Sequence, residues 1–372
     1  MRQNIYIAVL LSVLGGTVAP RLEGQQNWII GPWTRASQTP VIAPRAESVF
    51  QDPASGKPVH WEALHTFNPA AVVRDGKIFV LYRAEDDSGE MQIGGHTSRL
   101  GMAVSTDGVH FNRSPEPVFY ADKDDQAGRE TPGGVEDPRI VESADGNYIL
   151  TYTQWSRKTG IYTIGVATSR DLLHWKKFGP IFGTEGKYAL WKYKSAGIVT
   201  RIHDDRLIAA KIQGKYWMYW GEGEIHLATS SDLIHWHPRE GNDGEPEVLL
   251  QRRPGKSDSG FPETGPPAVL TRHGIVLLYN AKNAAGQTTD SHIGEGAYTV
   301  QEALFASDDP GRLLARTEDP VLQPVLDWEK SGQYAAGTTF GEGLVLFDGR
   351  WWLYYGSADS FVGVATAPEQ AR

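Results

Sequence analysis

The sequence predicts an all-β protein that folds as a five-bladed β-propeller. Three observations predict this fold: a short element repeats five times, a tight-turn signal precedes each copy, and no intervening segment shows a sustained helical period of apolar residues. A βαβ architecture is therefore disfavoured. A β-sandwich is the alternative, but it gives no reason for a fivefold period of roughly 60 residues.

The repeated element begins with an alanine, continues through small polar residues and an aspartate, and ends on an aromatic residue. It occurs at residues 103–111, 167–175 and 228–236, with weaker copies at residues 306–309 and 364–367. Its alanines stand at positions 103, 167, 228, 306 and 365, so successive copies are 64, 61, 78 and 59 residues apart. Radial repetition of one blade accounts for such a period.

A predicted β-hairpin precedes each copy of the element. An alternating apolar strand follows each of the turn dipeptides Asp75-Gly76, Asp145-Gly146, Asp204-Asp205, His273-Gly274 and Asp348-Gly349. Asp-Gly between two β-rich runs favours a hairpin because its tight turn needs positive φ angles. Residues 25–60 carry little repeat signal, and we expect them either to supply a strand that closes the ring or to pack across one face.

Polar residues recur at the start of the first strand of the predicted blades, and more of them follow the second strands. At the first strands they are Asn68, Asp137, Lys194, Glu263 and Thr338, and after the second strands Arg83, Glu85, Lys282 and Asp359. In a propeller both positions converge on one mouth of the central channel. Because burial of unpaired charge is costly, the ring predicts a functional site, with ion pairs between blades as the structural alternative.

Several of these residues lie in runs that resemble glycoside hydrolase family 130. The runs are Asn68-Pro69-Ala70, Tyr82-Arg83-Ala84-Glu85, Ser98-Arg99-Leu100-Gly101, Gly134-Val135-Glu136-Asp137-Pro138-Arg139 and Tyr355-Gly356-Ser357-Ala358-Asp359. They occur in the right order between residues 60 and 368. The resemblance implies a five-bladed propeller that acts on β-mannosides.

The family contains phosphorylases, which cleave with inorganic phosphate, and hydrolases, which use water. Its phosphorylases resemble one another in a His-Arg pair soon after a Gly-Lys-Tyr run. Here the run at residues 214–216 is followed by residues 217–224, which hold Glu222 and Glu224 and no cation. Carboxylates repel a phosphate dianion and lack the donors of Arg. Residues 263–267 likewise resemble the hydrolase branch, whose members act on β-1,2-linked mannosides.

The sequence therefore predicts a hydrolase that works with inversion and uses Glu222 and Glu263 as its two carboxyl groups. Inversion needs the two groups on opposite sides of the anomeric carbon, about 6.5–9.5 Å apart. Glu224 is the competitor of Glu222, and the sequence leaves open which glutamate is the acid and which the base. By resemblance, Asp137 matches the family's general acid, which in the phosphorylases acts through a sugar hydroxyl; here it either orients the hydroxyls or assists proton transfer.

The resemblance also implies which residues hold the sugar in the cleavage subsite. They are Asn68, Arg83, Glu85, Arg99, Lys194 and Asp359. A structural reading coexists with this one, in which the two arginines pair with nearby carboxylates. No cofactor is expected and no metal either, because His65 and His96 do not stand at ligand spacing.

The composition and the N-terminal segment limit the possible partners, chemistry and cellular location of the protein. The chain has 372 residues, 36 Lys+Arg against 45 Asp+Glu and no cysteine, which argues against nucleic acid as a partner and excludes disulfides and thiolate chemistry. Residues 1–24 resemble a signal peptide, with a positive start, a short apolar run and small residues after it. We therefore expect an exported, periplasmic or extracellular enzyme without a membrane anchor, whose residues 25–372 form one catalytic propeller. A buried first strand or helix is the other reading of the apolar run.

Three rival functions remain open. A phosphorylase of the same family would release mannose 1-phosphate. A five-bladed arabinan- or xylan-acting hydrolase would use two Asp and one Glu, against which the Glu-Asp-Pro-Arg run at residues 136–139 argues. A propeller lectin would bind a mannose-containing oligosaccharide without cleaving it, but it has no need for Glu222 and Glu263 in one site. The oligomeric state is left open.

Overall fold

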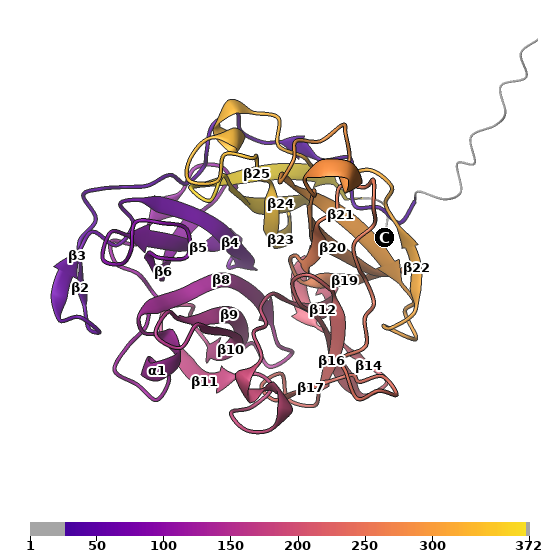
Figure 1. Cartoon of the computed structure of the whole chain (residues 1–372), viewed down its shortest axis with the longest axis horizontal. Helices are drawn as coiled ribbons and strands as arrows, with labels where there is room; N and C mark the ends of the chain where they lie inside the picture. The colour runs from indigo at the N-terminus through magenta and orange to yellow at the C-terminus, as the bar shows by residue number, and fades with distance from the viewer. Residues whose placement is uncertain (1–26, 370–372) are drawn as a thin grey trace, which may run out of the picture.

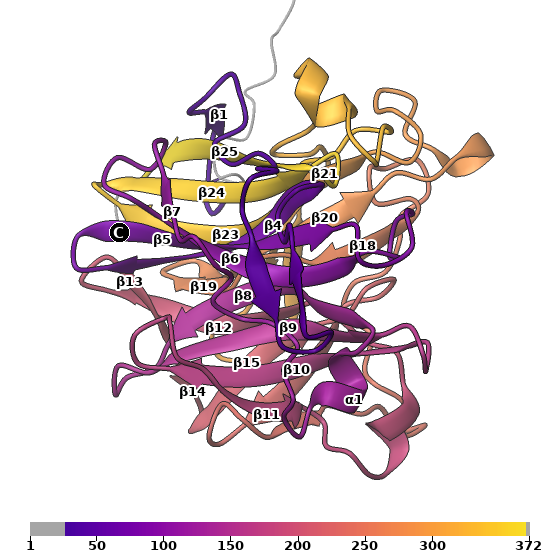
Figure 2. The same ribbon diagram turned by 90° about the vertical axis from the view of Figure 1, so that its left-hand side faces the viewer.

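Five antiparallel sheets stand around one axis in the computed structural model, which describes residues 27–369 (Figure 1). The five-bladed β-propeller predicted from the repeats is confirmed. The first strand of each blade lies nearest the axis, and the later strands lie progressively further out (Figures 1 and 2).

The strands of the five blades follow the chain in order. Blade one contains β4 (His65–Arg74), β5 (Lys77–Asp86), β6 (Thr97–Ser105) and β7 (Asn112–Arg113). Blade two contains β8 (Gly133–Glu142), β9 (Tyr148–Ser156), β10 (Ile161–Ser169) and β11 (Lys176–Pro180). Blade three contains β12 (Ala196–His203), β13 (Arg206–Ala209), β14 (Lys211–Ile212), β15 (Lys215–Trp220), β16 (His226–Ser230) and β17 (Trp236–Pro238). Blade four contains β18 (Phe261–Thr264), β19 (Ala268–Thr271), β20 (Gly274–Lys282), β21 (Tyr298–Phe305) and β22 (Leu313–Arg316). Blade five contains β23 (Phe340–Phe347), β24 (Arg350–Ser357) and β25 (Phe361–Pro368).

An N-terminal strand completes the last blade. β1 (Thr34–Arg35) pairs antiparallel with β25, with Thr34 opposite Thr366, so the first and last strands of the described residues meet in blade five. This confirms the first of the two expectations for residues 25–60. A separate hairpin, β2 (Phe50–Asp52) with β3 (Lys57–Val59), and the short helices α1 (Ala127–Glu130), η1 (Lys187–Leu190), η2 (Gly286–Thr288) and η3 (Asp327–Lys330) lie in the connections.

The predicted hairpin turns form where the sequence places them. Asp75-Gly76 and Asp348-Gly349 have positive φ at both residues, from 50 to 68°, which is the tight turn that Asp-Gly favours. Asp204 and Asp205 adopt the same conformation, but blade three then departs from the others. Within β12, β13 pairs only with the C-terminal half, from Thr200 to His203, and β15 pairs with the N-terminal half, from Ala196 to Ile198.

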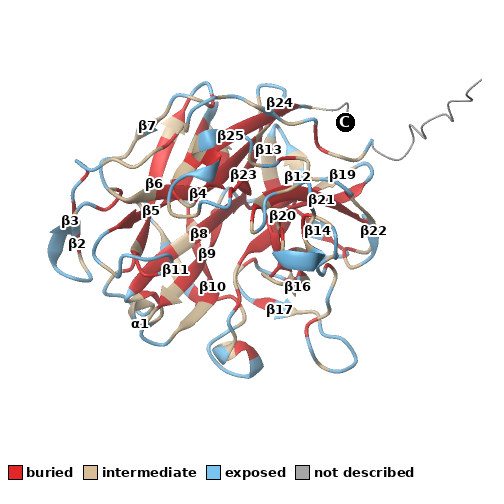
Figure 3. Ribbon diagram, turned by 45° about the horizontal axis from the view of Figure 1, so that its top comes forward, coloured by how far each residue is buried: buried red, intermediate tan, exposed pale blue. Residues whose placement is uncertain are grey.

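The core is divided among the junctions between blades. The described residues form five buried apolar clusters, and each joins two neighbouring sheets, as Leu278 of blade four and Leu353 of blade five do. Figure 3 shows that most of the strand residues are buried and that most of the connections are exposed. The apolar faces of the blades are thus covered by one another, as expected for radial packing.

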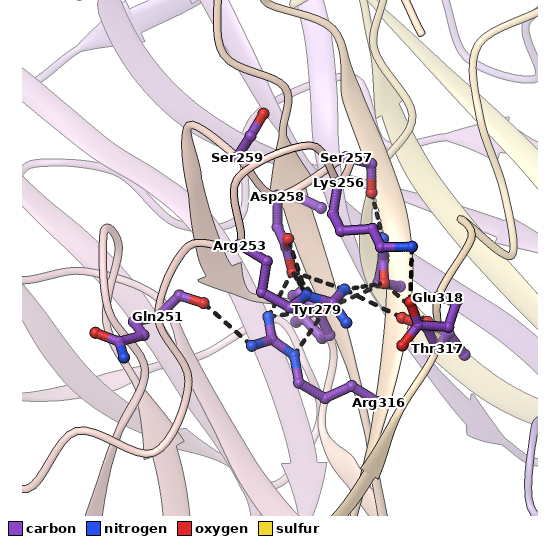
Figure 4. A network of polar contacts seen from close by, with 12 residues as sticks. Gln251, Arg253, Lys256, Ser257, Asp258, Ser259, Tyr279, Arg316, Thr317 and Glu318 are labelled. Carbon is purple, nitrogen blue, oxygen red and sulfur yellow. Dashed lines mark hydrogen bonds and ion pairs between the residues drawn. The ribbon is translucent and has the colours of Figure 1, made fainter. Parts of the chain in front are cut away.

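A buried carboxylate fixes the connection that leads into the first strand of four blades. In each, a tyrosine of the second strand donates to the carboxylate, and a cation of the outermost strand pairs with it. The sets are Tyr82, Glu62 and Arg113; Tyr152, Glu130 and Lys177; Tyr279, Asp258 and Arg316; and Tyr355, Glu329 and Arg35. Figure 4 shows the set of blade four, where Arg253 also pairs with Asp258 at 3.0 Å. In blade three, Tyr219 instead donates to the carbonyl of Pro310.

The predicted signal segment, residues 1–24, lies outside the described residues. Among residues 27–369, no helix has the length and apolar character needed to cross a membrane.

Candidate functional site

Local backbone geometry turns polar side chains of the first strands into the channel mouth. Asn68 and Asp137 sit at bulges of β4 and β8, with φ of 46° and 48°, and Ser195 precedes β12 with φ of 64°. A bulge re-aims a side chain out of the strand's regular alternation, and such strained residues concentrate at functional sites. The following proline in the first two cases cannot donate to the ladder, which suits an interrupted strand.

These residues open onto one cavity of about 310 Å³. Its walls come from all five blades: Phe67, Asn68, Arg83, Ile93, Gly94, Glu136, Asp137, Lys194, Glu263, Lys282, Tyr298, Gln333, Tyr334, Thr338, Phe340 and Asp359. Asn68, Asp137, Lys194 and Glu263 therefore converge on one face, as predicted from the blade alignment.

One wall of the cavity is an Arg83 cluster from blades one and two. The Arg83 guanidinium contacts Glu85 at 2.5 Å, Glu136 at 2.9 Å and Asp137 at 3.1 Å. The Asn68 amide donates to Asp137 at 2.8 Å. A single buried arginine thus holds three carboxylates, two of which line the cavity.

This cluster separates the proton affinities of neighbouring carboxyl groups. Burial opposes ionisation of Asp137, but Arg83, Lys194 and the Asn68 hydrogen bond outweigh it and lower the pKa of Asp137 to about 2. For Glu136, burial outweighs Arg83 and raises the pKa to about 7. Burial also raises the pKa of Asp359 to about 6. Adjacent acids with diverging pKa values are typical of a catalytic site.

The facing wall is a Lys194 cluster from blades three and four. The Lys194 ammonium lies 3.3 Å from an oxygen of Glu222 and 3.4 Å from Oε1 of Glu263. The Ser195 hydroxyl donates to the same Glu263 oxygen at 2.6 Å. Gly221 and Gly223, with φ of 122° and 90°, carry Glu222 to this position, and Glu222 and Glu263 are bridge partners on adjacent strands.

Glu263 holds a proton with unusual strength for a carboxylate. Its side chain is 1% exposed, and burial, together with the charge of Glu222, raises the pKa to about 7 against the opposing effects of Lys194 and Ser195. Burial alone would lower the pKa of the Lys194 ammonium, but Glu263, Glu222 and Asp137 raise it well above its usual value. Near neutral pH, Glu263 is therefore poised to accept or release a proton.

The two glutamates lie side by side and not across the cavity from each other. Because one ammonium contacts both, the nearest oxygens of Glu222 and Glu263 are at most about 6.7 Å apart, the lower edge of the range for inversion. The expectation that they stand on opposite sides of the anomeric carbon is corrected accordingly. The carboxylate on the facing wall is Asp137, held by Arg83 and Asn68.

Beneath the cavity, Arg139 ties the two walls together across the channel. Its guanidinium donates to the carbonyl of Asp137 at 3.0 Å and to the carbonyls of Thr264 and Gly265, beside Glu263, at 2.9 Å. It also pairs with Glu342 at 2.9 Å. Glu342 is fully buried, and burial raises its pKa well above the usual range.

Three sequence-predicted residues are not part of the cavity wall. Glu85 is fully buried behind Arg83 and also accepts from Gln333 at 3.1 Å. Arg99 is 2% exposed and pairs with Asp86 and Asp52, which ties β6 to the β2–β3 hairpin. Glu222 reaches the site through Lys194, with 27% of its side chain exposed. The competitor Glu224 is exposed and precedes β16.

Sequence reasoning gave no role to several residues of the wall. Glu136 stood in a recognised run, but only the three-dimensional contact with Arg83 marks it as part of the cluster. Tyr298, Gln333, Tyr334 and the loop residue Ile93 lie outside every repeat, and no sequence signal announced them.

One group of residues has the composition of a metal site. Ligand atoms of His65, Glu85 and His96 lie within 4.8 Å of one another. Tetrahedral ligands bound at about 2.1 Å stand about 3.4 Å apart. Glu85 is moreover engaged by Arg83, and His65 by the Ser360 hydroxyl at 2.9 Å. These internal contacts engage Glu85 and His65, whereas the buried Nδ1 of His96 has no hydrogen-bond partner among the described residues.

Fold and site together define a propeller enzyme that acts on glycosides. The family of β-1,4-mannooligosaccharide phosphorylases, glycoside hydrolase family 130, matches residues 35–371. The chain belongs to this family, and the predicted resemblance is confirmed. It is an enzyme family that acts on β-mannosides.

The similar proteins include phosphorylases, which use phosphate, and hydrolases, which use water. The 1,2-β-oligomannan phosphorylase of Thermoanaerobacter sp. is 33% identical over 89% of this chain and 95% of its own. A solved structure with 46% identity and a TM-score of 0.89, covering 93% of this chain and 96% of its own, is described with the statement that the GH130 family of mannoside phosphorylases contains glycoside hydrolases that target β-1,2 mannosidic linkages in Candida mannan. A glycosyl hydrolase structure from Bacteroides ovatus has the same identity, coverage and TM-score.

Proposed function

We propose that this protein hydrolyses β-1,2-linked mannosides with inversion, with water and not phosphate as the nucleophile. Glu263 is the general base, Glu222 raises its pKa and orients the water, and Asp137 serves the leaving-group side. The observation that carries the proposal is the pair of carboxylates, Glu222 and Glu263, that flanks the Lys194 ammonium at 3.3 and 3.4 Å.

Electrostatics favours water over phosphate at this wall. Residues 217–224, where a His-Arg pair is expected in the family's phosphorylases, contain no cation. The Lys194 ammonium already faces two glutamates, so a phosphate dianion beside it gains little attraction and meets two like charges. A carboxylate with a pKa of about 7 is well suited to take a proton from water near neutral pH.

Asp137 supports the other half of the reaction. Inversion places the water and the leaving group on opposite faces of the sugar, and Asp137 faces the glutamates from the Arg83 wall. Its low pKa in the free cavity suits acceptance of hydrogen bonds from sugar hydroxyls. To act as the acid it must gain a proton when the substrate excludes water, because exclusion of water disfavours the charged form.

The direct test removes each carboxylate without changing its shape. Glu263→Gln and Glu222→Gln are expected to lower kcat on β-1,2-mannobiose by about 10²–10⁴-fold, the usual contribution of a general base, with smaller changes in KM. Glu224→Gln, two residues from Glu222 but exposed, is the matched control and should keep full activity. Full activity of both glutamine variants of the proposed pair would exclude them from the mechanism.

A phosphorylase is the second candidate, because the relatives named above include a phosphorylase of β-1,2-linked oligomannan. It requires phosphate for turnover, whereas the hydrolase does not. We also propose export, from the signal-like residues 1–24. Expression of the full chain should give a product shortened at its N-terminus outside the cytoplasm; a cytoplasmic product that retains Met1 would exclude export.

A further inference from the structure

A row of three side chains stands at the mouth end of blade four, and two of them, Lys282 and Tyr298, line the cavity. Phe261, the first residue of β18, stands opposite Lys282, the last residue of β20, and Lys282 stands opposite Tyr298, the first residue of β21. Cross-strand partners share one face of a sheet. The row therefore lies on the same face of the sheet as Glu263. It is nearer to the channel mouth than Glu263 by two residues, or about 6.6 Å along the strand.

Aromatic rings surround the Lys282 ammonium in this row. The ammonium lies 5.3 Å from the ring centre of Phe261, 5.1 Å from that of Tyr298 and 5.6 Å from that of Tyr334. Phe340 packs on Tyr298 with ring centres 5.7 Å apart. The rings hold the lysine in place, and those of Tyr298 and Tyr334 also line this part of the cavity.

Lys282 differs from the other two cations of the cavity wall in its polar contacts. Arg83 is engaged by three carboxylates and Lys194 by two. Among residues 27–369, no carboxylate forms an ion pair with Lys282, and its ammonium donates no hydrogen bond to a protein acceptor. The three N–H donors of this ammonium, at the wall of the cavity, thus have no acceptor among the described residues.

We propose that Lys282, Tyr298 and Tyr334 form the subsite for the leaving-group sugar, with Lys282, supported by Phe261, donating charge-assisted hydrogen bonds to that sugar's hydroxyl oxygens. Aromatic faces beside a strong donor match the chemistry of a pyranose, which has apolar C–H faces and a rim of hydroxyls. The Lys194 and Arg83 clusters lie deeper and take the sugar that is cleaved off. This assignment rests on the proposed function, because it places the bond that breaks between the two subsites.

The test compares substrates that differ only in their leaving group. Hydrogen bonds to a charged donor are worth about 10- to 100-fold, so Lys282→Met should lower kcat/KM on β-1,2-mannobiose by that factor. Hydrolysis of β-mannosyl fluoride, whose leaving group is no sugar, should stay within about twofold of the wild-type rate. Lys211→Met is the matched control, since Lys211 lies 4.8 Å from the Tyr216 ring but outside the cavity.

Binding measurements separate failure of the subsite from failure of the proposed function. Calorimetry is done in the Glu263→Gln background, which suppresses turnover of the ligand: there Lys282→Met should weaken binding of β-1,2-mannobiose and leave binding of methyl β-mannoside unchanged. An equal loss on both substrates and both ligands, or no loss on any, would overturn the subsite. A loss confined to phosphate-dependent turnover would also overturn it, and would make Lys282 a phosphate ligand. A wild-type enzyme that binds mannobiose in this manner but hydrolyses neither substrate would refute the hydrolase alone.

Discussion

Substitution of either of two neighbours, Ser195 or Glu222, should shift the pKa of Glu263, in opposite directions. The pH at which activity rises should shift with that pKa. If Glu263 is the base, kcat/KM rises with pH through the pKa of the free enzyme, which burial and Glu222 set at about 7. Ser195 donates a 2.6 Å hydrogen bond that stabilises the charged form. Ser195→Ala removes about 1.5–3 kcal/mol of that stabilisation, so the acidic limb should move up by about one to two pH units.

Glu222→Gln should move the same limb the other way. A like charge at most about 6.7 Å away costs at least about 2.5 kcal/mol at an effective dielectric constant of 20, and Lys194 offsets part of it. Loss of that repulsion lowers the pKa of Glu263, so the limb should fall by about one pH unit while the plateau also drops.

The assay is kcat/KM on β-1,2-mannobiose between pH 4 and 10, with released mannose measured. Ser230→Ala is the control, because Ser230 is equally buried and also donates to a carboxylate, Asp232, but lies outside the cavity. Its limb should coincide with that of the wild type. General loosening of the pocket cannot shift the limb in both directions, so limbs that stay fixed, or that move together, would refute Glu263 as the base.

Three further predictions concern the residues that hold the site and the blades. Arg139→Met should lower kcat at least tenfold and destabilise the fold by about 3–5 kcal/mol, because it leaves Glu342 buried without its cation; Arg139→Met with Glu342→Leu should regain stability in denaturant unfolding but not activity. Lys177→Met strips Glu130 of its buried partner and should cost about 3–5 kcal/mol of unfolding free energy, whereas Lys176→Met at the exposed neighbouring position should cost almost none. Burial raises the pKa of Glu302 to about 8 from 4.5, so this group lowers the free energy of unfolding by about 1.4 kcal/mol for each pH unit of rise between about pH 4.5 and 8. Glu302→Gln should remove this contribution from the dependence of the unfolding free energy on pH. Parallel pH dependences of the variant and the wild type would contradict the prediction.

The fold followed from the sequence because its signals are local and repeated. Asp75-Gly76 and Asp348-Gly349 dictate their turns through backbone conformation alone, and the apolar alternation after them fixes which face is buried. Blade three was the hardest to predict. Nothing in its composition indicates that β15 replaces β13 beside the N-terminal half of β12.

The site was predictable only as far as position along the chain determines it. Asn68, Asp137, Lys194 and Glu263 could be placed at one mouth because each opens a first strand. The side-by-side arrangement of Glu222 and Glu263 depends on a bridge between blades three and four, which no local pattern encodes.

The side chains that surround Arg99 and Lys282 could not be predicted from the sequence either. Arg99 looks like a sugar ligand by resemblance, yet its guanidinium is taken by Asp86 and Asp52 from two other strands. The sequence places Lys282 at the channel mouth but gives no sign of the three rings, from separate segments, that surround its ammonium.

The most direct test of the account is to identify the first product formed from the methyl glycoside of β-1,2-mannobiose in the presence of phosphate, because the mannose whose bond is cleaved is then the only free mannose released. Proton nuclear magnetic resonance, recorded as the reaction starts, distinguishes the anomers of mannose from mannose 1-phosphate. Hydrolysis with inversion predicts free α-mannose, at a rate that phosphate does not increase. Mannose 1-phosphate as the main product would contradict the central claim, and free β-mannose would contradict inversion.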